Sequence, residues 1–217
     1  HYPGVLPPVN FETIEQLRKN KPLCHAQYKQ LYEYVMGDMP ADINSPEGKQ
    51  AYIEYMNYYL WLQSNVDKEI GKVIRALEGS ANRSNTIVIF TADHGDQIGS
   101  HGLSGKQCCA YEESLNVPFC VVDYTQSLIP AGQRGTKRSN FGSSVDIFPT
   151  ILNLAVGKDA PLPENYGYLS GVSLLPNIID GSRPTKEEVL FTYDFNLAGV
   201  VSAPDHIRCC INHEWKG

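Results

Sequence analysis

An acidic residue, a histidine and a lysine lie close together in one glycine-rich stretch of the sequence. Asp93 and His94 follow a short β-branched run, and Lys106 follows the last of several glycines. A carboxylate oxygen and an imidazole nitrogen suit a divalent cation, without choosing between Ca, Mn and Zn. A lysine ammonium beside a metal ion needs an anion between them, and phosphate and sulfate groups fit that gap. The pattern therefore indicates a site for a metal ion and an anionic group.

The same residues have a simpler interpretation, which the spacing leaves open. Asp93 could cap the turn that follows it, and Lys106 could be a solvated loop lysine. The position favours a site, because open α/β sheets bind ligands beyond the carboxyl ends of their strands. Asp93 and His94 can share one ion only if the strand ends at about Ala92, since neighbouring strand side chains point to opposite faces.

The hydrophobic periodicity predicts the elements that must position these residues. A Pro-rich segment over 1–22 should be extended, and a helix should lie within 23–39. The other expected elements are a helix from Ser45-Pro46 to Leu77 ended by Gly79, strands at 86–91, 117–122, 189–193 and 207–212, and a helix at 145–156.

These elements predict an α/β fold, a layered sheet with flanking helices. A helix followed by a turn and a buried strand is half of a βαβ unit, so we expect a parallel sheet with the 86–91 strand in its interior. We expect one partial unit over 1–217. Its parts are a linker at 1–22, a core with the metal and anion motif at 23–156, and a loop-rich segment at 157–217 that begins a carboxyl-terminal region.

Composition excludes several classes of protein. The 217 residues carry a net charge of -6, and 18 Lys+Arg against 24 Asp+Glu argue against nucleic acid as a partner. No stretch approaches about 18 consecutive apolar residues, which predicts no membrane span. The start resembles no signal peptide and lacks Met, so we expect a mature form or a fragment. The six cysteines match no zinc spacing and should be ordinary thiols, several of them buried.

Ordered segments along the chain resemble the carboxyl-side part of the sulfatase family, within the alkaline phosphatase superfamily. The resemblance runs from roughly residue 7 to 181. The segments that carry it are 7–12, 66–73, 87–95, 100–102, 105–106, 111–114, 117–118, 144–152 and 170–176.

This resemblance gives the candidate residues specific roles. Asp93 and His94 correspond to two ligands of the active-site metal, with Ca expected first and Mn or Zn as alternatives. Lys106 corresponds to the lysine that binds the sulfate. The resemblance thus implies an incomplete sulfatase-like fold in a metal-dependent sulfuric ester hydrolase. Its partner would be a sulfated small molecule or glycan. It allows an exported enzyme, and the localisation is otherwise unknown.

Three further residues match family positions, and we interpret all of them as structural. His101 should fix the loop through a hydrogen bond. Asp67 and Asp146 should be buried partners that cap a helix or join two elements.

The sequence also departs from the family pattern. The nucleophile of sulfatases is a formylglycine made from Cys or Ser in Cys/Ser-x-Pro-x-Arg, and none of the cysteines begins this pattern; Cys24 is followed by His25-Ala26-Gln27. The family's amino-terminal Asp pair has no counterpart either. We therefore expect that the formylglycine-bearing amino-terminal half is a required partner, and that this chain alone is inactive.

Two other functions stay open at this point. One is a phosphonate or phosphate diester hydrolase of the same superfamily, where a His at the position of His94 also occurs. An unmodified Thr or Ser as the upstream nucleophile would favour it. The other is a non-catalytic, truncated domain that acts as a scaffold or binding module.

Overall fold

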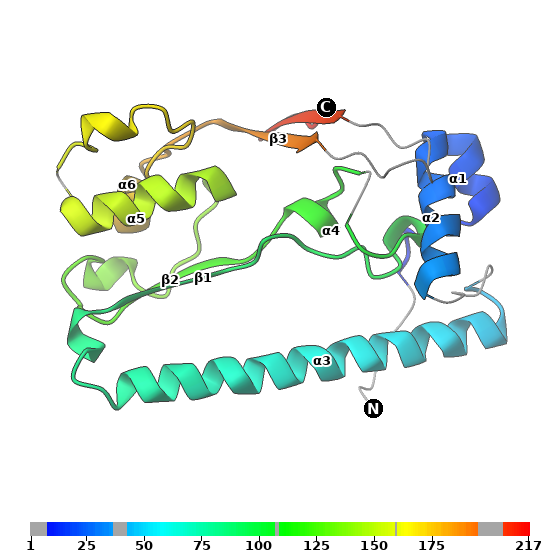
Figure 1. Cartoon of the computed structure of the whole chain (residues 1–217), viewed down its shortest axis with the longest axis horizontal. Coiled ribbons are helices and arrows are strands. Elements are labelled where there is room, and N and C mark those ends of the chain that lie inside the picture. Colours follow the sequence, from blue (N-terminus) through cyan, green and yellow to red (C-terminus); the bar gives the residue numbers. More distant parts are fainter. Residues whose placement is uncertain (1–7, 37–42, 107–108, 159, 195–205) are drawn as a thin grey trace. The chain divides into compact units, whose positions relative to one another are not determined.

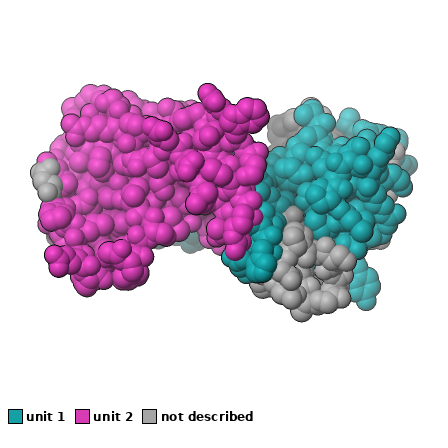
Figure 2. All heavy atoms as spheres, turned by 90° about the horizontal axis from the view of Figure 1, so that it is seen from above, with its two compact units in different colours: residues 1–80, 94–118, 193–207 teal, residues 81–93, 119–192, 208–217 magenta. Residues whose placement is uncertain are grey.

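The structure is a computed structural model, and it describes residues 8–36, 43–106, 109–158, 160–194 and 206–217. The chain divides into two compact units, which Figure 2 distinguishes by colour. Unit 1 comprises residues 1–80, 94–118 and 193–207, and unit 2 comprises residues 81–93, 119–192 and 208–217. The boundary between the units thus falls between Asp93 and His94, and each unit is described by itself.

Unit 1 begins with two short helices. Helix α1 (Ile14–Asn20) starts at a capping box, in which Thr13 Oγ1 accepts from the Gln16 backbone and the Gln16 side chain accepts from the Thr13 backbone. The prediction of an extended segment over 1–22 is therefore wrong at 14–20, because the prolines before it concealed this start signal. Helix α2 (Leu23–Met36) was predicted and is confirmed. A buried cluster joins the two helices to the later chain through Leu17, Ala26, Tyr28 and Leu103.

Helix α3 (Pro46–Glu78) confirms the predicted long helix, which Figure 1 shows as continuous. Ser45 Oγ accepts from the Gly48 backbone N–H at 3.0 Å, and Gly79 ends the helix. Only Gly48 and Tyr52 are buried along it. Asp67 lies in mid-helix and is exposed, so its prediction as a buried partner is wrong. No described element of the unit covers that part of the helix.

The first two predicted strands are present in unit 2, but their pairing differs from the prediction. Strands β1 (Ile87–Thr91) and β2 (Phe119–Asp123) are antiparallel, with Ile87 opposite Asp123 and Thr91 opposite Phe119. Among the described residues they form a two-stranded sheet, in which Phe90 is 43% exposed. The predictions of a parallel sheet and of an interior position for β1 are therefore wrong for this chain. The apolar run at 87–91 is enough to predict that a strand forms. The partner and the direction of that strand depend on the connection at 92–118.

The remaining elements follow the predicted order. Helix α5 (Ile147–Val156) is as expected, and strands β3 (Glu188–Asp194) and β4 (His206–Asn212) pair in a second sheet. Shorter helices are α4 (Glu112–Leu115) and α6 (Leu175–Ile179). Single 3-10 turns lie at Arg83–Asn85, Ser100–Gly102, Ala131–Gln133, Ser144–Asp146 and Glu164–Tyr166. None of the helices in the described ranges is long and apolar enough to cross a membrane.

Asp146 joins three segments of unit 2, as predicted. Its side chain is fully buried and accepts from the backbone N–H groups of Ser143 and Val172, each at 2.8 Å. The Lys186 ammonium lies 2.6 Å from its Oδ2 atom. This carboxylate therefore fixes the start of α5 to the turn at 172 and to the chain before β3. The thiols of Cys24, Cys109 and Cys209 are free and buried, which confirms the expected state of these cysteines, and Cys108 lies outside the described residues.

Candidate active site

Strand β1 ends at Thr91, which agrees with the strand end that a shared ion would require. Asp93 follows in a bend and its side chain is exposed in unit 2. His94 is the first residue of the unit 1 segment and is half-buried. The sharing of one metal ion by these two residues stays a prediction.

The His94 ring is oriented by its own chain. Its Nδ1 atom lies 2.7 Å from the carbonyl oxygen of Gly95, which fits an Nδ1–H donor and makes Nε2 the acceptor nitrogen. Histidines that bind metals commonly donate their other ring nitrogen in this way. A side chain at Gly95 would not fit, because a Cβ atom there would lie 2.0 Å from the Glu113 carbonyl oxygen. The Gly95 N–H donates to the Ser114 carbonyl at 2.9 Å, so this position is fixed against α4.

The chain after Gly95 closes into a hydrogen-bonded ring. The Gln97 N–H donates to the Gly105 carbonyl at 2.8 Å. Asp96 Oδ1 accepts from the Ile98 N–H at 2.9 Å and from the Gly105 N–H at 3.2 Å. We call residues 96–105 the site ring. Both backbone groups of Gly105 are thus bonded to the start of the ring, which fixes the backbone from which Lys106 follows.

Lys106 itself is exposed in this chain, and residues 107–108 lie outside the described ranges. An exposed side chain is what the simpler interpretation, a solvated loop lysine, also expects. Its role in binding an anion stays a prediction.

Tyrosines of the helices surround the site ring, a feature that sequence reasoning missed. The Tyr52 hydroxyl donates to the Ile98 carbonyl at 3.0 Å, and a Cβ atom at Gly105 would lie 2.9 Å from the Tyr28 hydroxyl. Burial, with the nearby Asp96 charge, raises the pKa of Tyr55 to about 12. The spacing of Tyr52 and Tyr55 along one helix face was the available signal. The raised pKa keeps Tyr55 neutral at ordinary pH. Together the tyrosines form the wall behind the site ring.

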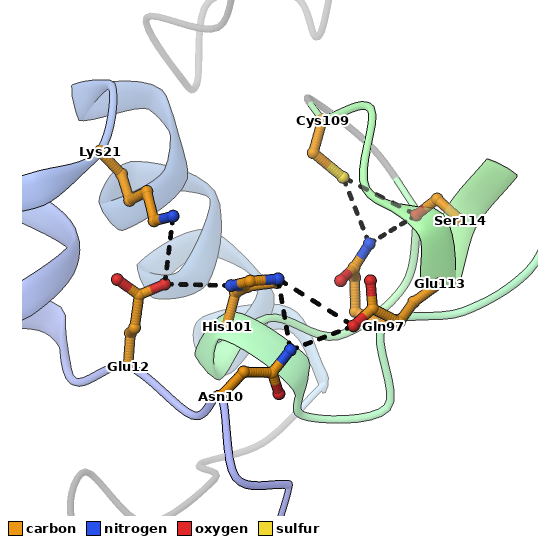
Figure 3. A network of polar contacts seen from close by, with 8 residues as sticks. All are labelled: Asn10, Glu12, Lys21, Gln97, His101, Cys109, Glu113 and Ser114. Atoms are coloured by element: carbon orange, nitrogen blue, oxygen red, sulfur yellow. Dashed lines mark hydrogen bonds and ion pairs between the residues drawn. The ribbon is translucent and has the colours of Figure 1, made fainter. Parts of the chain in front are cut away.

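A polar network anchors the other side of the site ring (Figure 3). His101 Nδ1 lies 3.1 Å from Glu12 Oε2, and Nε2 lies 3.4 Å from Asn10 Nδ2. This confirms His101 as a loop-fixing residue. Burial alone would raise the pKa of Glu113, but hydrogen bonds from the backbone, from Asn10 and from Ser100 hold it below its ordinary value.

The donor types fit part of a metal site. Asp93 and His94 offer an oxygen and a nitrogen, which suit the cations named above. Across the part of the chain that the structure describes, no group of three or more His, Cys, Asp or Glu side chains could hold an ion. Two ligands bind a cation weakly, because hard cations take about six or more.

Comparisons with known proteins find relatives that are several times longer than this chain. The arylsulfatase of Volvox carteri is 32% identical over 168 residues, which cover 73% of this chain and 24% of the relative. A multifunctional alkaline phosphatase superfamily protein, PehA of Trinickia caryophylli, is 32% identical over 143 residues, covering 65% of this chain and 25% of the relative. The chain thus spans about a quarter of the length of these curated relatives.

The solved structures agree on the fold. The structure described as a 2-O GAG sulfatase superposes with a TM-score of 0.72 at 21% identity, covering all of this chain and 42% of that chain. The sequence model described as Sulfatase matches residues 13–158, more than half of the chain. The chain belongs to the sulfatase family.

Proposed function

We propose that this chain supplies part of the metal and sulfate-binding site of a metal-dependent sulfuric ester hydrolase. Asp93 and His94 bind the divalent cation, for which Ca is the first candidate, and Lys106 binds the sulfate group. When bound, the cation would polarise the ester and lower the pKa of the nucleophile. The Lys106 ammonium holds a sulfate oxygen and stabilises the negative charge that develops there.

The observation that carries this proposal is the closure of the site ring. His94 lies three residues before Gln97, and Lys106 directly follows Gly105, whose carbonyl accepts from Gln97 at 2.8 Å. His94 and Lys106 therefore lie just outside the two ends of one closed loop in unit 1. This closure supports the proposal that a metal ligand and a cation for the sulfate come from the two ends of the same loop. The orientation of His94, with Nε2 as the acceptor nitrogen, supports the same assignment.

The partner that we propose is an amino-terminal half of the same protein, which would carry the nucleophile. The chain covers 42% of the solved structure to which it is similar, and no Cys/Ser-x-Pro-x-Arg occurs in its sequence. Large apolar side chains are exposed on α3, on the β1–β2 sheet and around α5, as a surface normally buried inside a protein would be. They are Trp61, Val66, Val73, Phe90, Val122, Phe148 and Ile151. The substrate we propose is a sulfated small molecule or glycan, in keeping with the 2-O GAG sulfatase.

The test compares the chain with and without that half. We expect no turnover of an aryl sulfate by the 217-residue chain with excess Ca²⁺ or Mn²⁺, and turnover when the amino-terminal half is present. Asp93→Ala should abolish this turnover. Turnover by the chain alone that disappears in Asp93→Ala would reveal a nucleophile in the chain itself. A complete protein without turnover would favour the scaffold role.

The second candidate is phosphonate or phosphate diester hydrolysis. The multifunctional alkaline phosphatase superfamily relative supports it. The ratio of kcat/KM for an aryl sulfate to kcat/KM for an aryl phosphonate monoester separates the two reactions. A ratio well above one supports the sulfatase proposal, and a ratio well below one supports the alternative.

A further inference from the structure

We infer that His101 is a positioning residue for the candidate site: it clasps the segment Asn10–Glu12 onto the site ring and thereby holds the backbone that precedes Lys106. The inference rests on the proposed function in one respect only, that Lys106 binds an anion. We call the contacts of His101 with Asn10 and Glu12 the clasp, and all of them lie within unit 1.

The site ring is strained and needs outside support. Ile98 and His101 have positive φ values of 47° and 56°, and the glycines at 99, 102 and 105 have φ values of 89°, 69° and 76°. A β-branched residue in this region is rare, and each non-glycine residue there adds backbone strain. Such a backbone persists only when its surroundings determine it.

The His101 ring provides that support through both of its nitrogens. In the tautomer with Nδ1–H, the ring donates to Glu12 at 3.1 Å and Nε2 accepts from the Asn10 amide at 3.4 Å. The same Asn10 amide donates to Glu113 at 3.2 Å. The ring also stacks on Tyr111, with centroids 3.9 Å apart. One imidazole therefore joins the amino-terminal segment, the site ring and the start of α4, as Figure 3 shows for the polar contacts.

Charged groups complete the clasp from neighbouring elements. Lys21, just after α1, lies 3.6 Å from the Glu12 carboxylate and faces the Tyr111 ring. The Glu113 carboxylate lies 4.0 Å from His101 Nε2. From α2, the buried Lys29 ammonium donates to the Gly102 carbonyl at 2.9 Å. These groups hold the site ring at His101 and Gly102, which both have positive φ values.

The amino-terminal segment and the site ring meet backbone to backbone. The His101 N–H donates to the Asn10 carbonyl at 3.1 Å. A Cβ atom at Gly102 would lie only 2.1 Å from the Glu12 carbonyl oxygen. Movement of Asn10–Glu12 would therefore be transmitted to residues 101–102, and through the ring to Gly105 and Lys106.

Amide hydrogen exchange of the 217-residue chain tests the clasp without any activity. We expect His101→Ala to speed exchange of the Gly99, Gly102 and Gly105 amides about tenfold or more and to leave β1 and β2 unchanged. His101→Asn should restore most of the protection, because Asn tolerates positive φ and its amide can donate to Glu12. Glu12→Gln, which leaves the ring sequence intact, should give the same pattern more weakly.

His206→Ala is the matched control. His206 also contacts a carboxylate, Asp194 at 2.6 Å, but on an exposed strand pair. It should leave exchange in the site ring unchanged. Unchanged protection of Gly105 in His101→Ala, or a loss that spreads equally to β1 and β2, would overturn the inference.

A second arm uses the complete protein and addresses Lys106. If His101 positions Lys106, Lys106→Ala should lower kcat/KM by a smaller factor in the His101→Ala background than in the wild type. Equal factors would overturn the positioning role. A complete protein without sulfatase activity would contradict the proposed function and leave the exchange result to decide on the clasp.

Discussion

Two polar anchors, one in each unit, hold distant segments by different means. In unit 2, the fully buried Asp146 carboxylate accepts backbone N–H groups and an ammonium at the unstrained start of α5. In unit 1, His101 is partly accessible, with 17% of its side chain exposed, and its backbone is strained. The comparison teaches that a buried charge secures a fold, whereas a shared network of weaker bonds holds a strained loop whose position matters for chemistry.

The largest effect should come from the unit 2 anchor. Asp146→Ala would leave the Lys186 ammonium, only 18% exposed, without its carboxylate, and two backbone donors without their acceptor. We expect the free energy of unfolding to fall by about 3 kcal/mol, measured by denaturant titration. Asp180→Ala removes an exposed carboxylate that pairs with Arg183 in the same unit and should lower the free energy of unfolding far less. Equal costs would remove the contrast between buried and exposed charges.

Lys106→Ala should lower the activity of the complete protein without changing the stability of unit 1. The side chain is exposed, so the denaturant midpoint should stay within the error of the wild type. In the complete protein, kcat/KM for an aryl sulfate should fall about 100-fold or more, since a cation for the developing charge is lost. Wild-type kcat/KM would make Lys106 an ordinary surface residue.

Gly102→Ala tests how tightly the clasp is packed. Its φ value is 69° and the new Cβ atom would collide with the Glu12 carbonyl. We expect a loss of about 2 kcal/mol in unit 1, with proteolysis at the amino-terminal segment as a second measurement. Gly135→Ala, at a φ value of 67° with nothing within 4 Å, measures the backbone strain alone. If both cost the same, the contact with Glu12 contributes nothing.

Tyr52→Phe removes one hydrogen bond from the wall behind the site ring. The lost hydroxyl donates to the Ile98 carbonyl, so we expect a cost of about 1 kcal/mol and faster exchange of the ring amides. Tyr58→Phe, on an exposed part of the same helix, should change neither quantity.

The smallest expected effect is on how the protection of the site ring changes at low pH. Because the pKa of Glu113 is held below its ordinary value, its carboxylate stabilises unit 1 above about pH 4.5, and this contribution is lost as the pH falls through the lowered pKa. Glu113→Gln should therefore flatten the loss of site-ring protection between about pH 5 and 3. An identical acid profile in the variant would show that the network does not depend on this charge.

The sequence allowed local structure to be predicted better than contacts between distant segments. Helix α3 carries its own start and end signals at Ser45 and Gly79, and the apolar run of β1 marks a strand. The antiparallel pairing of β1 depends on the path of the 92–118 connection, which no local pattern encodes.

The site follows the same rule. The stretch between His94 and Lys106 is rich in glycines, which permit tight turns, and the site ring closes within it. The contact of His101 with Glu12 bridges 89 positions of sequence, so a residue pattern around His101 could not identify its partner. The spacing of Tyr52 and Tyr55 predicts only that they share one face of a helix. Their position beside the site ring depends on how unit 1 folds.

The two-stranded sheet of β1 and β2 has a consequence for how this chain is made. Among the described residues each strand has one neighbour, so each has an unpaired edge, and Phe119 and Val122 add exposed apolar surface. Pro118 and Asp123 flank the apolar run of β2 but do not interrupt it. Open edges of this kind template the strands of other chains. Produced alone at high concentration, the polypeptide should therefore self-associate, and co-expression with the proposed amino-terminal half tests whether that half covers the sheet and keeps the chain in solution.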